Sequence, residues 1–198
     1  MIHQAVPDGS FTLPRGAGRA DGDGAQARQR GTTAYDYPAG MARSIATNRT
    51  VELPELLDFI RPRHHLLLVT TRRDGRPQVS PVSGGVDDHG RIVISTYPSR
   101  AKTLNAERDP RVSVVVLSDD WDGPWVQVDG DAEVLHMPEA EDALVDYYRC
   151  IAGEHPDWEE YRAAMRLQGK SLIRVTPTRW SPLATGGFPA DVAARLDS

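Results

Sequence analysis

The segment Ser99-Arg100-Ala101-Lys102-Thr103 gathers groups that could bind a phosphate. It follows Pro98 and opens a predicted helix, residues 100–108, so two cations, two hydroxyls and the first N–H groups of a helix meet at one place. Arg can clamp a phosphate with two parallel hydrogen bonds, whereas Lys supplies a compact charge. Only Lys102 and Lys170 among the 23 basic residues are Lys, which makes Lys102 stand out. The spacing alone is equally compatible with a solvent-exposed helix end.

Two tryptophans, Trp121 and Trp125, flank Asp122-Gly123-Pro124 just before a predicted strand. Tryptophans beside a loop can form the wall of a pocket for a flat ligand. They can also cap the core of the domain, and the pattern by itself favours this second interpretation.

The other reactive side chains form no recognisable catalytic or metal-binding pattern. The six histidines include no HxxxH or HExxH pair, and His64 and His65 at a strand start are expected to point to opposite faces. Cys150 is predicted to lie at the edge of an amphipathic helix, where a free Cys is usually an apolar filler. The Asp pairs at 87–88 and 119–120 fall in predicted turns. The sequence therefore predicts no catalytic side chain and no metal ligand.

The composition of the chain predicts a cytoplasmic protein. Its 198 residues carry a formal charge of −5, which gives no electrostatic reason to expect nucleic acid or an anionic membrane as a partner. The sequence has no apolar run near the ~20 residues of a membrane span, and its start has no apolar signal core. One cysteine excludes an internal disulfide and fits a reducing compartment.

The order of elements behind these residues predicts an α+β domain built around an antiparallel barrel of six or seven strands. Helices are expected at 52–60, 100–108, 139–152 and from 156. Strands are expected at 66–71, 77–86, 91–96, 112–117 and 171–176, with a hairpin over 125–135 that turns near Asp129-Gly130-Asp131. Consecutive hairpins without βαβ alternation favour a sheet that closes on itself and so removes its edges.

The first 40 residues differ from the rest of the chain. They are rich in Gly and poor in patterned apolar residues, so they are expected to form a disordered N-terminal tail. The GAGRADG run at 16–22 has no glycine at the third fingerprint position, Asp21, which argues against nucleotide binding there. The folded domain is expected to span residues 41–198, and Met41 could be the true start of translation.

Four segments carry a resemblance to a known family: DGRPQVSPV at 74–82, STYPSRAKTLNAERDPRVSVVVL at 95–117, WVQVDGDAEVL at 125–135 and YYRCIAGEHPDWEEYRAAM at 147–165. Together they resemble the pyridoxamine-phosphate-oxidase-like split β-barrels, and within them the reductases that depend on the deazaflavin coenzyme F420. The resemblance covers most of residues 55–180. It implies a split barrel with peripheral helices and a homodimer that holds a flavin or deazaflavin between its subunits.

The resemblance also implies roles for individual residues. Arg100, Lys102 and Thr103 would hold the cofactor phosphate with help from Ser95 and Thr96, and Trp121 or Trp125 of the partner subunit would line the substrate side. The segment from Gln78 to Val82 would run along the ring with backbone groups facing its polar edge. The full set implied for cofactor binding is Gln78, Val79, Ser80, Pro81, Val82, Ser95, Thr96, Arg100, Ala101, Lys102, Thr103, Asn105, Trp121 and Trp125.

Two departures from the family pattern bear on function. Pro81 stands where close relatives carry an Asn near the cofactor, and the segment TPTRWSPLATGGF at 176–188 lacks the Trp-plus-Arg ending that vitamin B6 oxidases carry. The function that the resemblance implies is hydride transfer between coenzyme F420 and a small organic acceptor. The alternatives are an FMN-dependent oxidase or reductase of the same fold, and a flavin- or haem-binding carrier without turnover.

Overall fold

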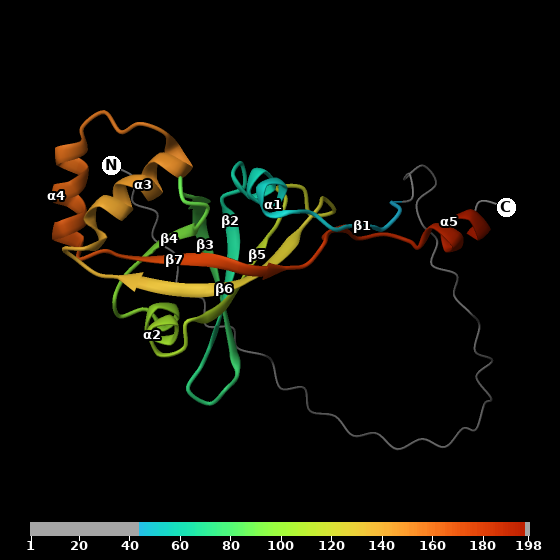
Figure 1. The fold of residues 1–198 in the computed structure, drawn as a ribbon, viewed down its shortest axis with the longest axis horizontal. Coiled ribbons are helices and arrows are strands. Elements are labelled where there is room, and N and C mark those ends of the chain that lie inside the picture. The colour runs from blue at the N-terminus through green and yellow to red at the C-terminus, as the bar shows by residue number, and fades with distance from the viewer. Residues whose placement is uncertain (1–43, 197–198) are drawn as a thin grey trace, which may run out of the picture. The chain divides into compact units, whose positions relative to one another are not determined.

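The computed structural model describes residues 44–196 as an α+β domain, as the sequence predicts (Figure 1). The predicted tail at residues 1–40 lies outside the described residues. The strands are β1 (Thr47–Arg49), β2 (His65–Thr71), β3 (Pro77–Val86), β4 (Ile92–Thr96), β5 (Arg111–Val116), β6 (Val126–Leu135), β7 (Ser171–Trp180) and β8 (Leu183–Thr185). The helices are α1 (Leu53–Ile60), α2 (Ala101–Arg108), α3 (Ala140–Ala152), α4 (Trp158–Gln168) and α5 (Ala190–Leu196).

Six strands form a closed barrel in the order β2-β3-β4-β7-β6-β5, and every neighbouring pair is antiparallel. The predicted antiparallel barrel is therefore confirmed, with six strands. The barrel interior is filled by the alternate apolar residues of each strand, such as Leu68 in β2, Ile94 in β4, Val114 in β5 and Ile173 in β7, all fully buried. Closure gives each of the six strands two neighbouring strands, although β3 pairs with β4 only from Gly84 to Val86.

The hairpin predicted over 125–135 is wrong, because this segment is the single strand β6. Its register against β7 shifts between Asp129 and Gly130, which marks a β-bulge or a similar irregularity. A Cβ atom at Gly130 would lie 2.4 Å from the carbonyl oxygen of Thr176 and 2.7 Å from Cγ1 of Val175. Gly130 therefore lies where β6 and β7 approach each other closely, and the chain forms no turn there.

Helix α3 covers the outside of the barrel over β3, β4 and β7, and α4 packs against α3, on the left of Figure 1. Val93 and Leu172, which point outward from β4 and β7, pack with Leu144 of α3 and Tyr161 of α4. The Tyr161 hydroxyl donates a hydrogen bond to the Leu144 carbonyl at 2.9 Å, and its burial raises the pKa of Tyr161 to about 12. This layer fixes the place where α4 ends and β7 begins.

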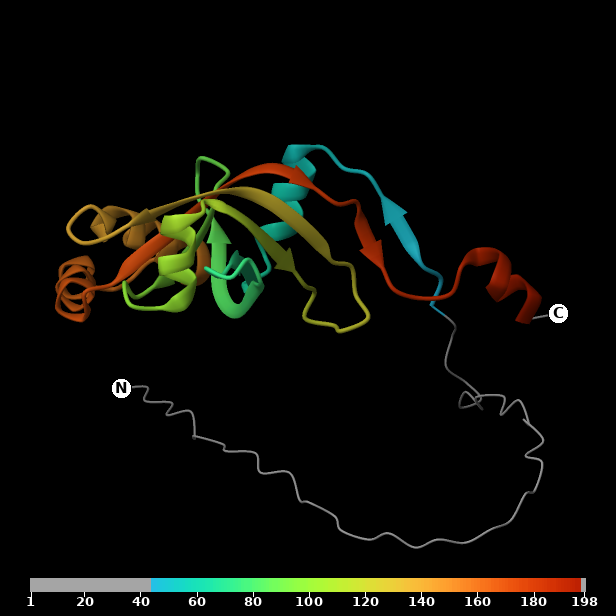
Figure 2. The ribbon, with the colours of Figure 1, turned by 90° about the horizontal axis from the view of Figure 1, so that it is seen from below.

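A second, two-stranded sheet was not predicted from the sequence. It pairs β1 with β8, and Figure 2 shows it with α5 to one side of the barrel. β7 also runs further than predicted, to Trp180, whose indole N–H donates to the Val51 carbonyl at 2.8 Å. No helix within residues 44–196 has the length and apolar character needed to span a membrane.

Candidate cofactor-binding site

Helix α2 begins with unsatisfied hydrogen-bond donors. Arg100 precedes it in an extended conformation, and no side chain caps it. The Arg100 carbonyl accepts from the N–H groups of Thr103 and Leu104 at 2.9 and 3.1 Å. The N–H groups of Ala101 and Lys102 have no acceptor within the described part of the chain. With the positive end of the helix dipole behind them, these donors suit an anion.

Three cations surround this helix end, and one of them was missed by the sequence prediction. The Lys170 Nζ atom lies 3.9 Å from the centre of the Tyr97 ring, and Cζ of Arg100 lies 5.9 Å from the same centre. The third cation is Lys102. Lys170 reaches the site because β4 and β7 pair Thr96 with Ser171. The feature of the sequence that could have identified Lys170 is its residue type, because Lys102 and Lys170 are the only lysines in the chain.

The three cations have no carboxylate partner among the described residues, so their charges act on one another. The pKa of Lys102 is lowered by burial first, and then by the positive charges of Arg100 and Lys170. A bound anion would oppose this repulsion and favour the protonated form of Lys102. The electrostatics of the site therefore favour anion binding.

The predicted hydroxyl ligands do not share one face. Thr96 and Thr103 are buried, their Oγ1 atoms are 3.0 Å apart, and Thr103 donates to the Tyr97 carbonyl at 2.8 Å. Both hydroxyls thus anchor α2 to the end of β4. Ser95 lies opposite Leu172 on the outside of the barrel and is half-buried. The phosphate-binding roles of these three hydroxyls stay predictions.

Asn105 lies inside the protein and fixes α2 from its inner side. Its Nδ2 donates to Thr70 Oγ1 at 3.1 Å, and its Oδ1 accepts from Arg108 at 3.0 Å. Thr70 in turn donates to the Gln78 side chain at 3.2 Å, and Gln78 donates to Ser80 Oγ at 2.7 Å. This chain of polar groups, in which Asn105 and Thr70 are buried, connects α2 to β3. In this structure Asn105 therefore positions the helix, and its predicted contact with a cofactor is untested.

The predicted ring-binding segment, Gln78 to Val82, has one free backbone edge. β3 pairs with β2 from Pro77 to Ser83, but with β4 only from Gly84 to Val86. The second edge of the earlier part has no strand partner within residues 44–196, so its N–H and C=O groups can bind the polar edge of a ring. Val79 and Pro81 point outward and are exposed.

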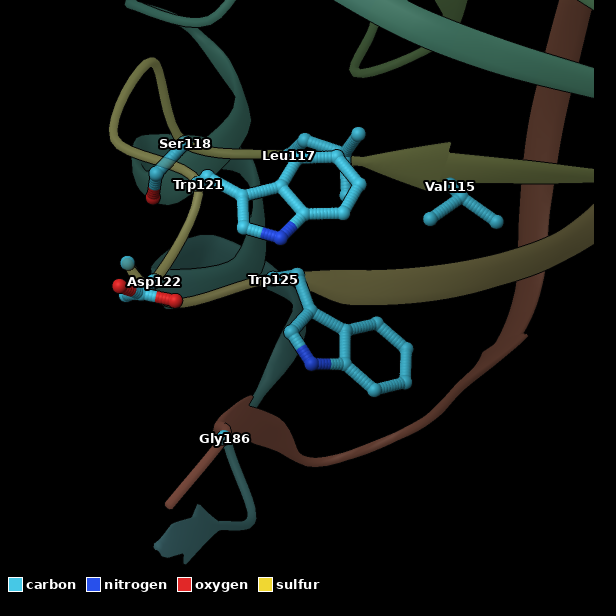
Figure 3. Close-up of a pocket in the computed structure, with 8 residues that line it drawn as sticks. Val115, Leu117, Ser118, Trp121, Asp122, Trp125 and Gly186 are labelled. Carbon is cyan, nitrogen blue, oxygen red and sulfur yellow. The ribbon is translucent and has the colours of Figure 1, made fainter. Parts of the chain in front are cut away.

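Trp121 and Trp125 line a cavity of about 370 Å³ with Val115, Leu117, Ser118, Asp122, Gly123 and Gly186 (Figure 3). Trp121 is 88% exposed and Trp125 38%, so neither caps the barrel core. Leu117 also lines a second hollow that contains Pro81 and Val82. The structure thus brings the tryptophans to the same outer face as the predicted ring-binding strand. The sequence prediction did not assign Leu117 to a pocket, because the apolar strand expected at 112–117 suggests only a core residue there.

The remaining candidates for chemistry stay separate. His64 contacts the Gly84 carbonyl through Nδ1 at 3.0 Å, and His65 lies near Asp119. The described residues contain no group of three or more His, Cys, Asp or Glu side chains that could hold a metal ion. Burial first, and then the charges of Asp87 and Asp88, raise the pKa of the Cys150 thiol to about 11, which makes it a poor nucleophile.

The family model described as pyridoxamine 5'-phosphate oxidase matches residues 53–184, about two thirds of the chain. The chain belongs to the pyridoxamine 5'-phosphate oxidase family. The match includes the whole barrel, the start of α2 and both tryptophans of the cavity. The match does not include β1 or α5 of this chain.

Solved structures share the barrel of this family member. The conserved hypothetical protein Rv2991 from Mycobacterium tuberculosis is 25% identical, with a TM-score of 0.58 over 71% of this chain and 89% of that chain. The heme storage protein HutZ from Vibrio cholerae is 21% identical, with a TM-score of 0.52 over 67% and 95%. An F420 reductase is 22% identical over 63% and 94%, with a TM-score of 0.49. The similarity to HutZ shows the fold alone, and that to the reductase is too low to support an argument about the cofactor.

Proposed function

We propose that this protein is an oxidoreductase that transfers a hydride between coenzyme F420 and a small organic acceptor. The family it belongs to includes oxidoreductases with flavin-type cofactors. The observation that carries the proposal is the group of three cations at the start of α2, which have no carboxylate partner within residues 44–196, together with the free backbone edge of β3. Hydrogen bonds from Asn105 through Thr70 to Gln78 connect α2 to this strand. Such an arrangement suits a ligand with an anionic tail and a polar ring. The choice of F420 is supported by the sequence segments at 95–117 and 147–165.

The residues present fit such a cofactor. Arg100 and Lys102 would hold its phosphate together with the free N–H groups of the first turn of α2. The free edge of β3 from Gln78 to Val82 would bind the polar edge of its ring. When bound, a reduced deazaflavin supplies the hydride itself, so the protein has to bind and orient. We assign no side chain to proton transfer, and the proton of the reduced product would come from solvent.

We propose further that the active site is completed by a second copy of the chain. Outward residues of β2, β3 and β5 include the apolar side chains Leu67, Val79 and Val115, and Val79 is 53% exposed. Trp121 is 88% exposed and lies in the loop that follows β5. Exposed large apolar side chains that lie close together can mark a protein–protein interface. A homodimer would cover these side chains and place Trp121 or Trp125 of one subunit beside the ring bound by the other.

FMN is the second candidate, because the matching family model is that of an oxidase with a flavin-type cofactor. A carrier without turnover is the third, and HutZ shows that this fold also occurs in a heme storage protein. These candidates differ in the reaction they allow.

A turnover assay separates them. Reduced F420 and reduced FMN are offered in parallel to the wild-type protein with a panel of enones, quinones and tetrapyrroles, and cofactor oxidation is followed by absorbance. We expect oxidation of F420 with at least one acceptor, and loss of that activity in Arg100→Ala. Oxidation of reduced FMN but not of reduced F420 would support the second candidate. Binding of a cofactor without turnover on any acceptor would support the carrier.

A further inference from the structure

Lys170 lies in the cation group at α2 but comes from a different part of the chain. It stands between α4 and β7, 68 residues after Lys102, and no sequence motif connects the two. We propose that Lys170 is a third anion-binding residue of this site, and that the group it binds carries at least two negative charges. The naming of the cofactor rests on the proposed function, whereas the role of Lys170 rests on the geometry.

The fold places Lys170 firmly. Gly169 ends α4 in the left-handed conformation, with φ +57°, and the Lys170 N–H donates to the Met165 carbonyl at 3.2 Å. The next residue, Ser171, pairs with Thr96 of β4. The backbone of Lys170 is thus held on both sides, by a helix cap and by a barrel strand.

The Tyr97 ring holds the side chain of Lys170 and connects it to α2. The Lys170 ammonium lies 3.9 Å from the ring centre, which is the geometry of a cation–π contact. The Tyr97 hydroxyl donates to Gln168 of α4 at 3.3 Å, and its carbonyl accepts from the N–H of Arg100 at 3.2 Å. Tyr97 therefore contacts Lys170 through its ring and the backbone of Arg100 through its carbonyl, and so connects the α4–β7 junction to the start of α2.

The charge of the group indicates the class of ligand. Three cations meet here without a carboxylate partner among the described residues, and burial first, and then the charges of Arg100 and Lys170, lower the pKa of Lys102. One negative charge would leave two positive charges repelling each other in a partly buried place. A dianion is the better match, and two chemistries supply it: a phosphate monoester, as in FMN, or a phosphodiester with a neighbouring carboxylate, as in the tail of F420.

The test compares Lys170→Met with Lys170→Arg, which keeps the charge, and with Arg61→Met, which removes an exposed charge at the end of α1. Inorganic pyrophosphate binding is measured by calorimetry. FMN is compared with riboflavin, and F420 with its phosphate-free deazaflavin chromophore, by fluorescence titration. We expect Lys170→Met to weaken binding of pyrophosphate and of the phosphate-bearing cofactor about tenfold. Binding of the phosphate-free chromophores stays within about twofold of wild type, as does every affinity of the two control variants.

Each other result has a defined meaning. Pyrophosphate affinity unchanged in Lys170→Met overturns the role of Lys170, and so does an equal loss for ligands with and without phosphate, which indicates a structural effect. If the wild type does not bind F420 while Lys170→Met binds FMN and pyrophosphate more weakly than the wild type does, the role of Lys170 is supported and the proposed F420 function is refuted. A wild type that binds none of the three anions contradicts both.

Discussion

Gly130→Ala tests the contact that closes the barrel between β6 and β7. The added methyl carbon would lie 2.4 Å from the Thr176 carbonyl oxygen and 2.7 Å from Val175 Cγ1, so the strands would have to separate by about 1 Å to restore ordinary contact. Neither neighbour can rotate away easily, since one is backbone and the other is a β-branched core side chain. From these contacts we expect a loss of about 2–4 kcal/mol in the free energy of unfolding.

The measurement is urea and thermal unfolding followed by circular dichroism. For a domain of this size the expected loss lowers Tm by roughly 5–15 °C. Gly186→Ala is the matched control, because a Cβ atom there meets nothing within 4 Å, and its stability should stay within about 0.5 kcal/mol of wild type. A Gly130→Ala protein as stable as this control would show that the strands do not approach as described.

Three further predictions address the site and the surface. Lys102→Ala should weaken cofactor binding at least about tenfold. Cofactor affinity unchanged in Lys102→Ala would place the phosphate elsewhere. In the wild type, anion affinity should fall as alkaline pH deprotonates Lys102, and because the pKa of Lys102 is lowered, this fall should begin at a lower pH than for an ordinary lysine. Cys150 should react with a thiol reagent at pH 8 about 100-fold more slowly than a thiol of ordinary pKa, because its pKa is raised to about 11; labelling at the ordinary rate would contradict its burial. Light scattering at micromolar concentration should give the mass of two 21.8 kDa chains, and Trp121→Ser should weaken that dimer; a monomeric wild type would refute the proposed interface.

The strands of the barrel could be predicted because their patterns are local. Asp74-Gly75 between two apolar runs identifies the hairpin of β2 and β3, and the apolar run of β5 identifies a buried strand. Gly130 was misread because an Asp-Gly-Asp sequence suits both a turn and a bulge, and only the partner strand distinguishes them. The β1–β8 sheet was missed because its two strands are three residues each and pair across most of the domain.

The candidate site could likewise be predicted only where its residues lie close together in the sequence. Arg100 and Lys102 are adjacent in sequence to a helix start, so a phosphate site could be inferred there. Lys170 joins them only through the pairing of β4 with β7, which no local pattern reveals. Conversely, the hydroxyls of Thr96 and Thr103 were expected at the phosphate because the family resemblance implies that role. In the fold both are buried and bonded to each other, which no spacing could show.

The central claim is the choice of cofactor, and the most direct test is an equilibrium titration of one wild-type preparation with F420 and with FMN. The account predicts that F420 binds more tightly than FMN, and that Lys102→Ala loses at least about tenfold of the F420 affinity. FMN binding much more tightly than F420 would contradict it.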